Sequence, residues 1–225
     1  MRLPTLGSDD KIDLEASEKL FDRAMEVGIN YYDTAYPYHG GNSEIVTGKL
    51  LSKYPRESYY LATKYPGHQI LPDYNPAPIF EEQLKKCGVD YFDFYLLHAV
   101  SEDNMWVFEE DKSYDYLIKQ KELGRIKHLG FSYHGNLEFF LELIDKYKWD
   151  FVQLQINYYD WENQNAKAYY EALENIDDDD FTLLEFRAKN DEDETEVFKR
   201  IEKRFDDAQK NWKGAFAPNT KLDMQ

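Results

Sequence analysis

Five short runs of apolar and aromatic residues, each typical of a buried β-strand, end on or beside a polar side chain. The runs are INYYDTA, SYYLATK, FDFYLLH, IKHLGFS and FVQLQIN. Their ends follow one another at intervals of roughly 30 residues, about the length of one strand and its crossover helix. When parallel strands are joined in this way, their carboxyl ends all lie along the same edge of the sheet. We therefore expect the side chains at these ends to converge on one pocket: Asp33, Lys64, His98, Ser132 and Asn157.

The segments between the runs carry the apolar spacing of amphipathic helices. We expect helices over 12–27, 43–53, the stretch that ends near residue 87, 112–123, 136–147 and 163–173. Ser43 is predicted to cap the second helix, because serine is common just before a first helical turn. The polar segment that follows the third run, with Met105 and Trp106, is expected to be a loop. Strands that alternate with helices in this order predict a parallel α/β fold.

The alternation ends near residue 173, and no interdomain linker precedes that point, so residues 1–173 are predicted to form one domain. Residues 174–225 open with an acidic segment that contains the run Asp177–Asp180, which is typical of a solvated loop. Residues 181–186 could add a sixth strand, and 192–212 have the apolar stripe of an amphipathic helix. This C-terminal part is expected to pack on the domain or on a second copy of it.

The charge and the cysteine content restrict the class of protein. A net charge of −17 over 225 residues argues against nucleic acid or an anionic membrane surface as the partner. The chain has no stretch of 18 apolar residues and no signal-peptide pattern at its start. Cys87 is the only cysteine, so no internal disulfide and no cysteine-built metal or Fe–S cluster is expected. We expect a cytoplasmic protein.

Asp33, Tyr38, Lys64 and His98 together suit one kind of chemistry. An ordinary phenol, with a pKa of about 10, is a poor proton donor or acceptor at neutral pH, and a nearby ammonium group lowers that pKa. A carboxylate keeps the ammonium charged and oriented, and an imidazole can hold a carbonyl oxygen. Such a set can deliver a proton to that oxygen while hydride reaches the carbon. Since no side chain supplies hydride, a nicotinamide cofactor is expected.

The segments that carry these residues resemble the strand-end motifs of the aldo-keto reductases. They are DTAYPYHGGNSE (33–44), LATK (61–64), LLH (96–98), GRIKHLGFS (124–132) and VQLQINYYD (152–160). Their variants are most similar to the bacterial branch that includes members with an extra Fe–S domain. The resemblance covers residues 1–173 and implies an eight-stranded (β/α)₈ barrel of the TIM type. It also implies NAD(P)H-dependent interconversion of carbonyls and alcohols, with a small aldehyde or ketone as substrate.

By this resemblance, Tyr38 is the general acid, Lys64 tunes it, Asp33 holds Lys64, and His98 orients the substrate. The resemblance further implies that the nicotinamide carboxamide is bound by Ser132 and Gln153, with Asn157 nearby. Loops 65–78 and 99–111 are expected to line the substrate pocket, and Tyr36, Met105 and Trp106 are candidates for its apolar walls. The choice between NADP and NAD is left open.

Each of these residues also has a simpler interpretation. Asp33 could cap a turn, Lys64 could extend outward from an apolar strand, and His98 could be a core histidine. The other histidines are expected in loops or in solvent; they are His39, His68, His128 and His134. A zinc site is disfavoured because no HxH or HExxH spacing is present.

The chain departs from the family pattern at both ends. The first barrel strand is not recognised before residue 12, and no phosphate-binding loop is recognised after 173, so an incomplete barrel of five or six parallel strands is expected. Exposed edges of such a barrel could pair with a second copy. Two other functions are therefore considered: a non-catalytic scaffold or interaction protein derived from a reductase, and a metal-dependent barrel hydrolase, which the histidine spacing disfavours.

Overall fold

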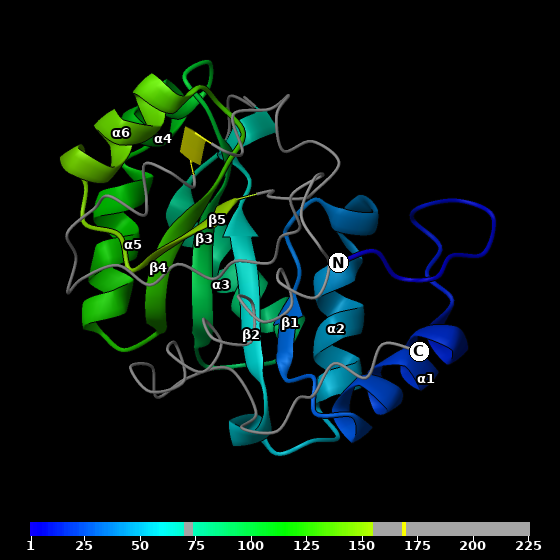
Figure 1. Ribbon diagram of the computed structural model, residues 1–225. Coiled ribbons are helices and arrows are strands. Elements are labelled where there is room, and N and C mark those ends of the chain that lie inside the picture. Colours follow the sequence, from blue (N-terminus) through cyan, green and yellow to red (C-terminus); the bar gives the residue numbers. More distant parts are fainter. Residues whose placement is uncertain (70–73, 155–167, 170–225) are drawn as a thin grey trace, which may run out of the picture.

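A computed structural model of the chain describes residues 1–69, 74–154 and 168–169. Its centre is one sheet of five strands, which are β1 (Tyr31–Asp33), β2 (Tyr60–Tyr65), β3 (Phe92–Val100), β4 (Ile126–Tyr133) and β5 (Phe151–Leu154). The strands lie in the order of the sequence, and every neighbouring pair is parallel. The sheet curls like part of a barrel wall, with β1 and β5 at its two edges among the described residues (Figure 1).

Helices connect the strands and lie mostly on the outer side of the curved sheet (Figure 1). They are α1 (Leu14–Glu26), α2 (Ser43–Leu51), α3 (Pro76–Cys87), α4 (Met105–Glu110), α5 (Ser113–Glu122) and α6 (Leu137–Lys146). Three short 3₁₀ turns add η1 (Tyr38–Gly41), η2 (Arg56–Ser58) and η3 (Gly67–Gln69). This strand–helix alternation confirms the predicted α/β class, and the five parallel strands of the described residues form part of a barrel of the (β/α) type.

Side-chain caps and left-handed glycines set most of the helix boundaries. Asp13 Oδ1 accepts a hydrogen bond from the backbone N–H of Ala16 at 3.0 Å, which satisfies a free donor in the first turn of α1. At the other end of a helix, Gly88 ends α3 in the left-handed region with φ 65°, where a residue with Cβ is strained. The helices over 14–26, 76–87, 113–122 and 137–146 match the sequence prediction to within a few residues.

Two local predictions are wrong. Ser43 does not cap α2 but is its first residue, because its side chain turns inward and accepts a hydrogen bond from the Thr34 hydroxyl at 2.9 Å. The segment predicted as a loop after β3 contains the helix α4, whose Met105, Val107 and Phe108 are buried. Six residues are too few for a helical period to stand out from a polar background, which explains the second error.

The two faces of the sheet are packed differently. The outer face and the helices enclose the main core, and at one point α2 and α3 touch so closely that a Cβ on Gly48 would collide with the carbonyl oxygen of Cys87. The inner face carries a smaller apolar cluster of Ala62, Phe94 and Leu96, which lies below the strand ends. The inward positions beyond this cluster, toward the carboxyl ends, are polar.

Several predictions fall outside the described residues: the helix over 163–173 except for residues 168–169, which are helical, the domain boundary at 173, the sixth strand over 181–186 and the amphipathic helix over 192–212. Within the described ranges, no helix is long and apolar enough to cross a membrane.

Candidate active site

The carboxyl ends of β1 and β2 bring Asp33 and Lys64 into contact, as the strand pattern predicts. Lys64 Nζ lies 2.6 Å from Asp33 Oδ1 and donates a second hydrogen bond to the carbonyl oxygen of Thr34 at 2.8 Å. The Lys64 side chain is only 3% exposed, and that of Asp33 is 19% exposed. The α-amino group of Met1 lies 3.5 Å from the same carboxylate oxygen. Lys64 is therefore a buried, paired cation that does not extend into solvent.

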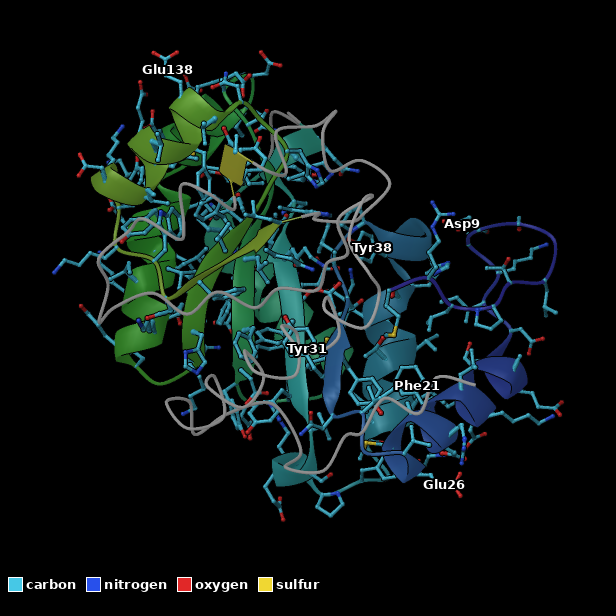
Figure 2. All side chains as sticks on the ribbon, in the orientation of Figure 1. Asp9, Phe21, Glu26, Tyr31, Tyr38 and Glu138 are labelled. Carbon is cyan, nitrogen blue, oxygen red and sulfur yellow. The ribbon has the colours of Figure 1, made fainter. Side chains whose placement is uncertain are left out.

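The ring of Tyr38 lies against the Lys64 ammonium of this ion pair. It begins the short turn η1, where His39 and Gly40 adopt left-handed angles and reverse the chain just beyond the end of β1. Figure 2 labels Tyr38 at the carboxyl end of the sheet, on the same side of the molecule as β1 and α2. Lys64 Nζ lies 4.8 Å from the centre of the Tyr38 ring. The positive charge thus faces the ring of the predicted proton donor at close range.

His98 completes the cluster from β3. Its Nε2 lies 3.5 Å from the Tyr38 hydroxyl, and the side chain is largely buried. Burial, reinforced by His68 and by the nearby charge of Lys64, lowers the pKa of His98 to about 2. The imidazole is therefore neutral at physiological pH. A neutral ring has one N–H donor and one bare acceptor nitrogen, so it can hold an oxygen without adding charge.

Ser132 and Gln153 are direct register partners on β4 and β5. Ser132 is buried, and its Oγ accepts a hydrogen bond from the backbone N–H of Ala99 at 2.7 Å. The hydroxyl hydrogen of Ser132 is left for a second contact. Gln153 has an exposed side chain. Asn157, the third residue predicted to contact a cofactor, lies outside the described residues.

Two of the other histidines differ from their prediction, whereas His134 is exposed in the loop after β4, as expected. His39 is buried, not in solvent: its Nε2 accepts from the N–H of Leu3 at 3.0 Å and its Nδ1 donates to the carbonyl of Asp9 at 2.7 Å. The His128 ring stacks on Phe94 on the inner face, with centroids 4.9 Å apart. His39 thus ties the segment before α1, through Leu3 and Asp9, to η1, and His128 belongs to the inner apolar layer.

The sequence analysis missed one residue of the cluster. The His68 ring, on η3, lies 4.1 Å from that of His98, centroid to centroid. Burial lowers the pKa of His68, so a second neutral imidazole lies beside that of His98. The only signal was its position four residues after Lys64. In the described part of the chain no group of three or more metal-binding side chains comes together.

The three candidates for apolar walls lie in different environments. Met105 is buried in the main core. Tyr36 turns toward α3, where its hydroxyl donates to Glu82 at 3.0 Å. Trp106 is 47% exposed and is thus the one member of the set with a large apolar surface open to a ligand.

Comparison with known proteins relates this geometry to a family. The family model described as "Aldo/keto reductase family" matches residues 3–203. The chain belongs to the aldo/keto reductase family. The match extends over most of the chain and includes every residue of the cluster described above.

Curated aldo-keto reductases match shorter segments. The NADH-specific methylglyoxal reductase of Escherichia coli is 35% identical over 92 residues, which are 33% of this chain and 28% of that protein. The aldo-keto reductase YhdN of Bacillus subtilis is 30% identical over 150 residues, which are 63% of this chain and 41% of that protein. The chain therefore spans well under two thirds of the length of the curated relatives it matches.

Solved aldo-keto reductases share the fold. A putative aldo-keto reductase from Pseudomonas aeruginosa superposes with a TM-score of 0.59 and 27% identity, over 74% of this chain and 65% of that chain. The Bombyx mori aldo-keto reductase, whose structure is a complex with NADP, gives a TM-score of 0.54 and 21% identity over 76% of this chain and 56% of that one. The second likeness shows the fold alone.

Three buried polar atoms at the strand ends have no hydrogen-bond partner among the described residues: Asp33 Oδ2, His68 Nδ1 and His98 Nδ1. Buried polar groups in folded proteins are nearly always bonded, so a cluster of unsatisfied ones is unusual. In this aldo/keto reductase chain they belong to residues linked through contacts with Lys64, Tyr38 and His98: Asp33 pairs with Lys64, His98 lies beside the Tyr38 hydroxyl, and His68 lies beside His98. Such an arrangement is typical of a site that completes its hydrogen bonds with a ligand.

Proposed function

We propose that this protein reduces a small aldehyde or ketone to an alcohol with a nicotinamide cofactor, and that Tyr38 donates the proton. The observation that carries this proposal is the stacked arrangement of three groups. The Asp33–Lys64 ion pair, at 2.6 Å, lies under the Tyr38 ring, and His98 Nε2 lies 3.5 Å from the Tyr38 hydroxyl. Tyr38 can therefore donate a proton to the same carbonyl oxygen that His98 holds in place.

The charge of Lys64 makes proton transfer from Tyr38 feasible. When a phenol gives up its proton, negative charge develops on its oxygen, and a fixed ammonium within a few ångströms stabilises that charge. Asp33 and the carbonyl of Thr34 hold the Lys64 ammonium in place. Because Lys64 is almost completely buried, water screens this interaction little.

His98 has a positioning role in this proposal. It is neutral because burial lowers its pKa, so its N–H can donate to a carbonyl oxygen without competing for the proton. A carbonyl oxygen held between His98 and the Tyr38 hydroxyl has its carbon exposed toward the inner face of the sheet. The carbon gains a hydride, the oxygen gains the Tyr38 proton, and the C=O double bond becomes a C–O single bond.

The nicotinamide cofactor supplies the hydride when it is bound. The residues present suit its carboxamide, which has one acceptor oxygen and one donor nitrogen. Ser132 has a hydroxyl hydrogen to donate, and Gln153, its register partner, has both donor and acceptor atoms. Asn157 is proposed as a third contact. Relatives include an NADH-specific enzyme and a structure with NADP, so either cofactor is compatible with the family.

The proposed substrate is a small carbonyl compound. The relative from Escherichia coli is named for methylglyoxal, a small aldehyde with a neighbouring ketone, which makes short aldehydes the first substrates to test. A cytoplasmic location and self-association through β1 and β5, the edge strands of the described sheet, also stay proposals.

The experiment is a carbonyl-dependent cofactor oxidation assay on the wild type and on Tyr38→Phe. We expect turnover with short aldehydes in the wild type and a loss of at least ~100-fold in the variant, because the general acid is removed. Tyr54→Phe is the matched control: its hydroxyl donates to Asp22 on the outer surface, far from the site, and turnover should be unchanged. Equal turnover in wild type and Tyr38→Phe would disprove the role of Tyr38.

A wild-type chain without turnover and without cofactor binding would instead support the non-catalytic alternative, a scaffold or interaction protein. Circular dichroism of both variants establishes that any loss of turnover arises in a folded chain.

A further inference from the structure

Strand β3 does not run straight to its end. Its register against β4 is regular from Tyr95 to Leu97, but then shifts, so that Val100 takes the place opposite Tyr133 that Ala99 would occupy in a regular ladder. One extra residue is therefore inserted into β3, as in a β-bulge. The bulge lies immediately after His98, the histidine that faces the Tyr38 hydroxyl.

The bulge is conformationally strained. Ala99 has φ 52°, in the left-handed region that a residue with Cβ avoids. A residue in such a conformation persists only where its surroundings hold it there, and strained residues of this kind gather at functional sites. The contacts that hold Ala99 are therefore candidates for residues that fix the position of His98.

Two buried side chains hold the bulge from opposite sides. Ser132 Oγ accepts from the N–H of Ala99 at 2.7 Å, and Asn104 Nδ2 donates to the carbonyl oxygen of Ala99 at 2.9 Å. Asn104 Oδ1 also accepts from the N–H of Ser101 at 3.0 Å. The amide of Asn104 thus spans the turn from Ala99 to Ser101 and satisfies backbone groups that the broken ladder leaves without a strand partner.

The Asn104 side chain bonds the end of β3 and not its own helix. Asn104 directly precedes α4, where an asparagine often caps the helix, yet its side chain makes no capping bond. Asn75 and Asn136 occupy the same place before α3 and α6, and both accept from a backbone N–H of their helix. Asn42, before α2, makes no capping bond either and donates to the carbonyl oxygen of Asp10 at 3.2 Å. Of these four residues, Asn104 is the one whose amide bonds the backbone at the end of a strand.

We propose that Asn104 is a positioning residue that locks the bulge at Ala99 and so fixes both the His98 imidazole and the Ser132 hydroxyl. Its role as a positioning residue for catalysis rests on the proposed reductase function, but its effect on the geometry of His98 does not. Without the amide, Ala99 can leave the left-handed region. His98 and the N–H that engages Ser132 would then move together.

The test measures His98 directly, without turnover. In the unliganded chain, the imidazole ¹⁵N and ¹³C NMR resonances of His98 should shift and broaden in Asn104→Ala, whereas those of His39, bonded elsewhere, should not move. Asn75→Ala is the matched control: it removes an asparagine before a helix but should leave His98 unchanged. Unmoved His98 resonances in a folded Asn104→Ala chain would overturn the proposal.

If Asn104→Ala does not fold, the double variant Ala99→Gly/Asn104→Ala carries the same test. Glycine adopts the left-handed region without strain, so folding is helped, but it adopts other conformations equally easily, so without the Asn104 amide the bulge is not held and His98 is still expected to move relative to Ala99→Gly alone. His98 resonances identical to those of Ala99→Gly alone would contradict the proposal.

A kinetic cycle then separates positioning from a general loss of structure. If the chain reduces carbonyls, Asn104→Ala should lower kcat/KM about 10-fold, because a catalytic group is displaced. In a His98→Ala background the same substitution should cause a smaller loss, because only the part of the effect that passes through Ser132 remains. An equal loss in both backgrounds would overturn the positioning role. A chain that shows the NMR shift but no turnover would refute the proposed function alone.

Discussion

The amino and carboxyl edges of the sheet each carry a partly buried ion pair, but the two pairs have different surroundings. At the amino end, the Arg56 guanidinium lies 2.5 Å from Asp93 Oδ2. At the carboxyl end, the Lys64 ammonium lies 2.6 Å from Asp33 Oδ1. Both carboxylates sit on strands of one sheet, β3 and β1, so the contrast is between the groups around them.

The pair at the amino end is surrounded by further hydrogen bonds. Asp93 Oδ2 also accepts from the backbone N–H of Leu61 at 2.8 Å, and Arg56 donates to the carbonyl oxygens of Tyr59 and Tyr91. Among the buried side-chain atoms of this pair, Arg56 Nε alone has no hydrogen-bond partner in the described residues. This pair ties the start of β2 to the start of β3 and has little capacity left for a ligand.

The pair at the carboxyl end lies among unsatisfied groups. Asp33 Oδ2, His68 Nδ1 and His98 Nδ1 are buried without partners in the described residues, and His98 and Tyr38 approach each other only to 3.5 Å. Unsatisfied polar groups cost stability, so a fold tolerates them where a ligand completes their bonding. A buried ion pair alone does not show whether it has a structural or a functional role. The hydrogen bonding of the groups around it distinguishes the two.

The largest difference between the two edges is expected when one paired lysine is removed from each. Lys64→Met should lower carbonyl-dependent turnover at least ~100-fold, because the charge that stabilises the Tyr38 phenolate is lost. Lys121→Met is the matched control, since Lys121 pairs with Asp150 at the amino end of β5 at 2.5 Å. It should leave kcat/KM unchanged. Steady-state kinetics on both variants measures the difference, and equal losses would show that the two ends do not differ in function.

The amino-end pair should matter for stability. Asp93→Ala leaves the Arg56 guanidinium partly buried without its partner, and the free energy of unfolding should fall by about 2–3 kcal/mol, somewhat less than for a fully buried pair. The exposed pair of Arg125 with Glu81, at 2.7 Å, is the control, and Glu81→Ala should cost less than about 1 kcal/mol. Urea unfolding measures both. A cost for Asp93→Ala no greater than that for Glu81→Ala would refute the structural role.

The smallest effect concerns pH. The pKa of His98 is about 2 in the folded chain and 6.5 in the unfolded chain. Between these values the His98 ring is protonated in the unfolded chain but stays neutral in the folded one. Stability should therefore be unaffected by this group above pH 6.5 and should fall as the pH decreases below it. Glu44, whose pKa burial raises, acts in the opposite direction.

The measurement for this prediction is urea unfolding at pH 7.5 and 5.5. His98→Gln should reduce the loss of stability between these pH values by on the order of 1 kcal/mol relative to the wild type. An identical pH dependence in the two proteins would mean that His98 is not held neutral by the fold.

Much of the site is predictable because it depends on strand direction alone. Asp33, Lys64, His98 and Ser132 each end an apolar run, and parallel strands of similar length must bring such ends together. The ion pair shows this for Asp33 and Lys64, and the strand register places His98 and Ser132 on the next two strands of the same sheet. Tyr38 is different, since only the resemblance to a known family selected it from 19 tyrosines.

The features that the sequence did not reveal depend on contacts between distant segments. The bulge at Ala99 is a change in the register between β3 and β4, so the sequence of β3 alone does not predict it. His68 and His39 follow strands on short turns, where the path of the chain decides whether a histidine meets solvent or a neighbour. The cap of α2 was misplaced because Asn42 and Ser43 are both good capping residues, and packing against Thr34 decided between them.

The most direct test of the account is a titration of the purified chain with NADPH, followed by the fluorescence of its four tryptophans. The unsatisfied groups at the carboxyl ends, with Ser132 and Gln153 beside them, predict saturable binding in the micromolar range. Binding should be accompanied by shifts of the His98 resonances. No binding up to millimolar NADPH or NADH would contradict the claim that these strand ends form a nicotinamide-dependent site.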